Sequence, residues 1–131
     1  MTSTTKSSMT YQQHIDAIAL KYGVEVFYCP GCKGRAWPKA RRVRLPEIKS
    51  AVTYAVALHE LGHIIGHQSG LRIDREAQAW RWAEANAIEW TETMMRKAAK
   101  CIASYLAACA RRKNMRVPPA NHDAWKIASR A

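Results

Sequence analysis

The sequence predicts a small α+β protein with a mostly helical core and a short edge sheet of about three strands. Its 131 residues suit one domain, and 48% of them are apolar, which is enough to form a buried core. Short segments typical of strands are confined to residues 24–45, whereas helical periodicity dominates the rest. We expect the domain to cover residues 11–116, after a flexible tail at residues 1–10. Residues 117–131 form either a second tail or a short docked helix.

The first half of the domain begins with a predicted helix at Tyr11–Tyr22, which the following Gly23 stops. Three short strands are then predicted, at residues 24–28, 35–37 and 42–45. Alternation in the last strand predicts that Val43 and Leu45 face the core while the arginines beside them face solvent.

The second half is predicted to be helical. One apolar helix begins near residues 48–50 and runs to Gly66 or His67, before the Ser69-Gly70 break. A long helix is expected at residues 73–96 and another at residues 97–113, although the sequence does not define the boundary between them. The run Val117-Pro118-Pro119 ends the last of these helices.

The most informative motif lies in the apolar helix, where His59-Glu60-Leu61-Gly62-His63 spells H-E-x-x-H. Two histidines four residues apart occupy one face of a helix, so both imidazoles can reach one metal ion. A catalytic Zn²⁺ usually has three protein ligands and an open position for water. Glu60 is placed to act as the catalytic base that activates this zinc-bound water.

The third ligand is not supplied by the nearest histidine. His67 lies eight residues beyond His59, which is about 12 Å along a continuous helix, too far for one ion. The longer motif H-E-x-x-H-x-x-G-x-x-H would need histidine at position 69, where the chain has Ser69.

Acidic residues of the next helix are better candidates for this ligand: Asp74, Glu76 and Glu84. Glu76 is preferred because it lies one turn before Trp80, on the face expected to pack against the apolar helix. Asp74 is then a candidate to orient a metal-binding histidine through its free ring nitrogen.

Two segments together resemble the ImmA/IrrE-like metallopeptidases of phages and mobile elements: His59-Glu60-Leu61-Gly62-His63 and Asp74-Arg75-Glu76-Ala77-x-Ala79-Trp80-x-Trp82-Ala83. The resemblance covers roughly residues 35–83. It implies a small zincin-like fold, Zn²⁺ bound by His59, His63 and Glu76, and Glu60 as general base. It further implies hydrolysis of a peptide bond in a protein substrate such as a regulatory repressor. Trp82 stands where this family commonly has alanine or a smaller aromatic residue, as does Trp80.

Two further expectations follow for a peptidase. The substrate could add a strand to the sheet along an edge near Arg42–Leu45. A donor for the oxyanion would be Tyr54, Tyr105 or His122, and the sequence does not choose among them.

The formal charge of +11 favours anionic partners, including nucleic acid or an acidic protein surface. An alternative function is therefore a basic module that contacts nucleic acid or protein and keeps the metal site without proteolysis. The basic residues form three groups: Lys33, Arg35, Lys39, Arg41, Arg42 and Arg44; Arg96, Lys97 and Lys100; and Arg111, Arg112, Lys113 and Arg116.

The sequence also predicts a cytoplasmic protein. No apolar segment is long enough to span a membrane, and residues 1–10 do not resemble a signal peptide. In a reducing compartment we expect the four cysteines to be free thiols rather than disulfides. The turn Cys29-Pro30-Gly31-Cys32 could instead bind structural zinc, but Cys101 and Cys109 do not form the second close pair that such a site needs.

Overall fold

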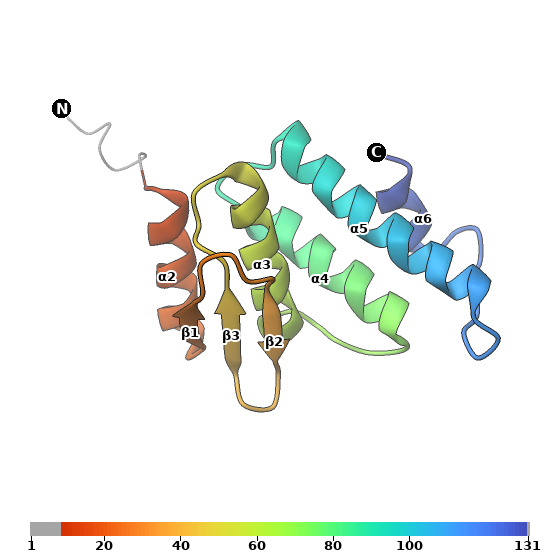
Figure 1. The fold of residues 1–131 in the computed structure, drawn as a ribbon, viewed down its shortest axis with the longest axis horizontal. Coiled ribbons are helices and arrows are strands. Elements are labelled where there is room, and N and C mark those ends of the chain that lie inside the picture. The colour runs from red at the N-terminus through yellow and green to blue at the C-terminus, as the bar shows by residue number, and fades with distance from the viewer. Residues whose placement is uncertain (1–8, 131) are drawn as a thin grey trace.

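The computed structural model describes residues 9–130 as a three-stranded sheet with helices packed beside it (Figure 1). This agrees with the predicted α+β class. The elements in chain order are α2 (Tyr11–Tyr22), β1 (Glu25–Tyr28), β2 (Arg35–Trp37), β3 (Arg42–Leu45), α3 (Ala51–Ile65), α4 (Arg72–Asn86), α5 (Glu92–Arg111) and α6 (Asp123–Ala128).

The sheet has the strand order β1-β3-β2, with β3 in the centre. β3 runs parallel to β1 and antiparallel to β2. Val43 and Leu45 are fully buried, so the predicted inward face of this strand is confirmed. Because both edges of β3 are already hydrogen-bonded, the expectation that a substrate strand adds near Arg42–Leu45 is wrong.

Helix α2 begins at a capping box formed by Thr10 and Gln13, and it ends at Gly23, which has the left-handed backbone (φ 66°) that glycine tolerates best. Residues 1–8 of the predicted N-terminal tail lie outside the described residues. Thr10 is predicted to lie in that tail but is instead the N-cap of the helix.

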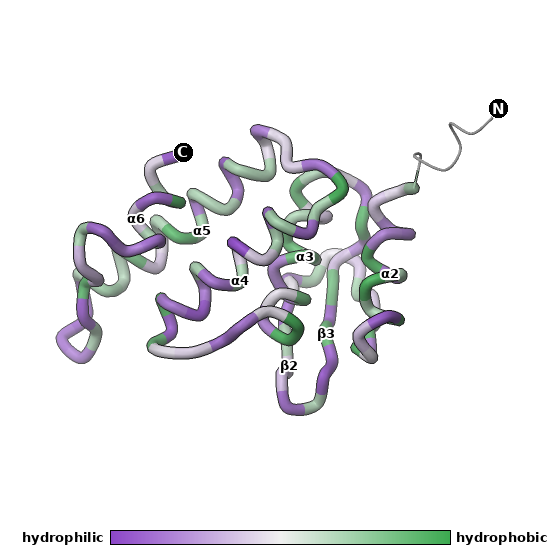
Figure 2. Tube along the Cα trace, turned by 180° about the vertical axis from the view of Figure 1, so that it is seen from behind, coloured by the Kyte–Doolittle hydropathy of each residue, from purple (hydrophilic) through white to green (hydrophobic). Residues whose placement is uncertain are grey.

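Helix α3 is the centre of the molecule and contacts α2, α4, α5 and two strands of the sheet. Ser50 and Thr53 form the capping box at its start. Figure 2 shows hydrophobic colour along much of α3, whereas α4 is largely hydrophilic. The helix ends at Ile65 because the chain becomes extended at Gly66, which places His67 outside it.

The predicted long helix at residues 73–96 is wrong, because the chain breaks between α4 and α5 at residues 87–91. No glycine or proline marks this break. The Thr91 side chain accepts a hydrogen bond from the Met94 amide and starts α5, while the Ile88 amide donates to the Tyr54 hydroxyl. The second of these contacts is tertiary, so periodicity alone could not locate the boundary.

Beyond α5, the chain turns back and forms α6, which contacts α4 and α5 (Figure 1). Ala124 and Ile127 are buried in this contact. Of the two alternatives for residues 117–131, the structure therefore has the short docked helix. No helix within residues 9–130 combines the length and apolar character needed to cross a membrane.

Candidate metal centre

The centre lies between α3 and α4, which pack closely at a glycine. A Cβ atom placed on Gly62 would lie 2.8 Å from the carbonyl oxygen of Ala79, so only glycine permits this approach. The ring of Trp82 also lies against Gly62. This packing turns the first turns of α4 toward the H-E-x-x-H face of α3.

Glu76 contacts both histidines of the motif. Its Oε1 lies 2.9 Å from Nε2 of His59, and its Oε2 lies 3.0 Å from Nε2 of His63. The two Nε2 atoms are 3.1 Å apart. The structure thus brings together the three residues predicted as metal ligands, from two different helices.

The other two acidic candidates lie elsewhere. Glu84 accepts a hydrogen bond from Arg130 at 2.9 Å. Asp74 pairs with Nε2 of His122 at 2.5 Å, so it does not orient a metal-binding histidine as proposed. Asp74 instead connects α4 to the segment before α6.

The residue that orients His63 is Gln68, which the sequence did not single out. The Nδ1 of His63 lies 2.9 Å from Oε1 of Gln68, whose amide nitrogen donates to the carbonyl of Arg75. With Nδ1 donating to this oxygen, the lone pair of Nε2 would be free for a metal ion that replaces the contact with Glu76. The imidazole of His59 is held differently, by stacking on Trp80 at 4.3 Å between ring centroids.

The charges of the cluster stabilise each other. Burial raises the pKa of Glu76, but hydrogen bonds from His59 and His63 outweigh this effect and lower it to about 2. Burial lowers the pKa of His59, but hydrogen bonds and the charges of Glu60 and Glu76 raise it to about 9. A cation between these side chains would therefore replace a proton that the cluster already holds.

Glu60 lies beside the histidines, and a carboxylate oxygen of Glu60 and one ring nitrogen of each histidine are within 4.8 Å of one another. Its side chain packs against the backbone of Gly34. A Cβ atom on Gly34 would be 2.9 Å from Cγ of Glu60 and 3.0 Å from its Oε2. The segment that enters β2 therefore confines the predicted catalytic carboxylate.

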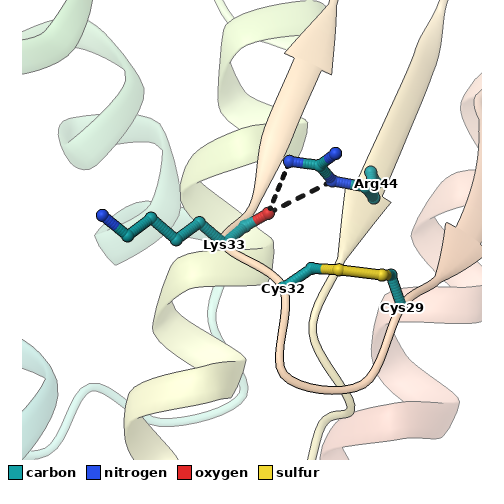
Figure 3. The surroundings of a disulfide bond; sticks show 4 residues. All are labelled: Cys29, Cys32, Lys33 and Arg44. Carbon is teal, nitrogen blue, oxygen red and sulfur yellow. Dashed lines mark hydrogen bonds between the residues drawn. A yellow bond between two sulfur atoms is a disulfide. The ribbon is translucent and has the colours of Figure 1, made fainter.

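The turn before this segment contains a disulfide between Cys29 and Cys32, shown in Figure 3, so the prediction of free thiols is wrong for this pair. The tight turn brings the two Cα atoms to 5.4 Å, within the range that a disulfide requires. Arg44 of β3 donates two hydrogen bonds to the carbonyl of Lys33 directly after the turn. Cys101 and Cys109 are free, as predicted.

An open cleft of about 540 Å³ exposes the cluster to solvent. A second cleft of about 580 Å³ also borders His59, Glu60 and Glu76. The first cleft is lined by Gly34, Arg35, Ala36, Pro38, His59, Glu60, His63, Gln68, Arg72, Arg75, Glu76 and Tyr105. The sequence did not identify Arg72 or Arg75 as part of the site, because their position depends on how α4 packs on α3.

Of the three candidate oxyanion donors, Tyr105 alone lines these clefts. Tyr54 is fully buried, with its hydroxyl 2.6 Å from Nδ1 of His14 and accepting from the Ile88 amide. His122 is occupied by Asp74. The hydroxyl of Tyr105 accepts a hydrogen bond from Arg72 at 3.1 Å, which leaves its own proton available.

Some residues of the basic groups form ion pairs with carboxylates at the surface. Arg42 pairs with Glu25 across the β1–β3 contact, and Arg96 pairs with Glu92 within α5. Their charge is therefore partly balanced within the molecule.

Comparison with known proteins gives no family assignment: no family model matches the chain, and no curated protein or solved structure matches it significantly.

Proposed function

We propose that the chain is a zinc-dependent metallopeptidase with a zincin-type site. The observation that carries this proposal is the convergence of His59, His63 and Glu76 beside Glu60 in an open cleft. Two imidazoles and one carboxylate are a ligand set of catalytic zinc. Ligand atoms of a tetrahedral zinc are about 3.3 Å apart at usual bond lengths, close to the separations of these atoms.

A bound zinc ion would supply a Lewis acid that polarises a peptide carbonyl and lowers the pKa of water to about 7. Glu60 accepts the proton of the attacking water and passes it to the leaving amine. Gln68 and Trp80 keep the two imidazoles aimed at a common point. The hydroxyl of Tyr105 donates to the developing oxyanion while Arg72 donates to Tyr105.

The free edge of β2 would receive the substrate. β2 pairs with β3 on one side, and no other strand among the described residues pairs with it. Gly34, Arg35 and Ala36 line the cleft, so a peptide added to this edge passes beside Glu60. The resemblance of the motif adds that the substrate is a protein, with regulatory repressors as the first candidates.

The test of the metal site uses two matched variants of α4. We expect zinc to copurify with the wild type in equimolar amount and to be lost from Glu76→Ala. Glu84→Ala removes the same charge from the same helix, away from the cluster, and should retain the metal. Zinc retained in Glu76→Ala would contradict the assigned third ligand.

The test of the chemistry uses Glu60→Gln, which keeps the shape of the side chain and removes the base. We expect it to bind zinc normally and to cleave denatured protein substrates at least 100-fold more slowly, a loss in the range of general-base catalysis. Mass spectrometry of the products gives the cleaved bonds. Equal cleavage by both proteins would exclude Glu60 as the base.

A further inference from the structure

Three arginines border the cleft that contains the metal cluster. Arg35 comes from β2, whereas Arg72 and Arg75 come from the first turn of α4. All three are exposed. The cleft therefore has positive side chains on two different elements that flank the reactive centre.

Within residues 9–130, none of these three arginines forms an ion pair. Arg72 donates to the Tyr105 hydroxyl, and Arg75 donates to the carbonyl of Gly70 at 3.1 Å. Arg35 lies over the ring of Trp37 at 5.0 Å. Other arginines of the chain have carboxylate partners, at Arg42–Glu25, Arg81–Asp123 and Arg130–Glu84.

Asp74, next to Arg75, pairs with His122, and the two carboxylates that line the cleft form no ion pair with these arginines. Glu60 and Glu76 are buried in the floor of the cleft and face the histidines. The adjoining cleft adds Lys33 and Lys97 to the positive lining. The accessible rim of the cleft is therefore cationic, while Glu60 and Glu76 contact the histidines in its floor.

We propose that this arginine rim (Arg35, Arg72 and Arg75) selects peptides with aspartate or glutamate close to the scissile bond. The inference rests on the proposed function, because the cluster defines which bond is meant. A peptide strand on the edge of β2 lies about 4.8 Å from it, so its side chains come within reach of the rim. Guanidinium groups bind carboxylates through two parallel hydrogen bonds, which a neutral amide cannot reproduce.

A peptide fits this location better than nucleic acid does. The rim lies inside a cleft of about 540 Å³ bordered by an unpaired strand edge, which offers backbone hydrogen bonds to an extended chain. The basic group around the end of α5, Arg111, Arg112, Lys113 and Arg116, is not among the residues lining this cleft.

The test measures binding without cleavage, with the full-length, zinc-loaded Glu60→Gln protein. Fluorescent decapeptides carry Ala-Ala at the centre, flanked by Asp, by Asn or by Lys on each side. In 50 mM salt we expect the Asp peptide to bind about tenfold more tightly than the Asn peptide, and the Lys peptide to bind most weakly. Raising the salt to 0.5 M should remove most of this difference, because it screens exposed charges.

The rim is tested by adding Arg72→Gln and Arg75→Gln to this protein. The preference for Asp over Asn should fall to about twofold or less. Arg111→Gln with Arg112→Gln removes the same charge at the end of α5 and should leave the preference intact. An equal loss in both double variants would show a general charge effect and overturn the assignment to the rim.

The remaining outcomes separate this inference from the proposed function. Equal binding of the Asp and Asn peptides overturns the inference, even if the wild type cleaves both. A rim-dependent preference for Asp supports the inference, even if the wild type cleaves neither and the peptidase proposal fails. A single-stranded oligonucleotide that displaces the Asp peptide and depends on the same arginines would make the cleft a nucleic-acid site and overturn the peptide assignment.

Discussion

At the scale of single residues, one hydrogen bond decides which way His63 points. Gln68 lies in the loop after α3, accepts from Nδ1 of His63 and is itself held by the carbonyl of Arg75. Partners of this kind fix the tautomer of a metal-binding histidine and raise its basicity. Gln68 is therefore part of the proposed metal site, although it is not one of the proposed ligands.

We expect Gln68→Ala to weaken zinc binding by about 10- to 100-fold. Competition with a chromophoric chelator measures the affinity. Gln78→Ala is the matched control, because Gln78 bonds the backbone of Ser69 in the same loop without touching a ligand. Similar affinities for the two variants would mean that the loop, rather than the contact with His63, supports the site.

Gly34 offers a second test at this scale, because its missing side chain leaves room for Glu60. A methyl group there would come within about 3 Å of the Glu60 side chain and of Val56. We expect Gly34→Ala to slow peptide cleavage by at least about tenfold, a part of what general-base catalysis contributes. Zinc content, measured on the same sample, should remain that of the wild type. Loss of zinc together with activity would show that the strand had moved as a whole.

At the scale of elements, the contact between α3 and α4 positions the ligands. Glu76 meets the histidines because the two helices approach closely at Gly62. In Gly62→Ala the new Cβ would meet the Ala79 backbone at 2.8 Å, so the helices must separate. Overpacking of this kind costs about 1–3 kcal/mol of unfolding free energy, which chemical denaturation measures.

The unfolding free energy of Gly62→Ala could in principle rise instead of fall, because alanine favours an isolated helix by up to about 1 kcal/mol over glycine. A more stable Gly62→Ala protein would therefore show that the helices separate without cost. We also expect weaker zinc binding, since Glu76 moves away with α4.

A chain of hydrogen bonds joins α2, α3 and the break before α5. The Tyr54 hydroxyl accepts from the Ile88 amide and can donate to Nδ1 of His14, which requires that nitrogen to be unprotonated. Burial lowers the pKa of His14 below its ordinary value of 6.5. His14 therefore binds a proton more readily in the unfolded chain than in the folded protein.

This difference destabilises the fold in acid. The unfolding free energy should fall as the pH drops below about 6.5 and level off below the folded pKa of His14. Urea unfolding of the metal-free protein at pH 7.5 and pH 5 tests this. In His14→Gln the loss between the two pH values should be smaller than in the wild type. Identical losses would show that His14 does not contribute to the pH dependence.

At the scale of the whole molecule, zinc binding would be coupled to folding, because α3 and α4 supply the proposed ligands of one centre. A ligand that binds only the folded state stabilises it by about 2.7 kcal/mol at 100 times its dissociation constant. We therefore expect added zinc to raise the melting temperature of the metal-free wild type and of Glu84→Ala. Glu76→Ala should respond much less, and an equal response would place the metal elsewhere.

Local signals are sufficient for most of the element positions. Strands at residues 35–37 and 42–45 and the helix at residues 11–22 have the predicted bounds, because alternation, caps and stops act over a few residues. The spacing of His59 and His63 likewise needs only the geometry of one helix. The position of Glu76 beside the histidines was also predictable, because a short turn and the position of Trp80 limit how α4 packs on α3.

Other features depend on parts of the chain that are distant in sequence. The Tyr54 hydroxyl contacts the break before α5, and Gln68 reaches His63 from a loop. Strand β3 lies between β1 and β2, so neither of its edges is free to pair with a substrate. The arginine rim exists because β2 and α4 border one cleft. The sequence by itself thus determined the class of fold, which follows from short-range periodicity, and it pointed to the proposed ligands through the spacing of one motif and the packing face of the next helix. Only the tertiary structure decided which strand edge, which tyrosine and which charges face those ligands, because these depend on how whole elements pack.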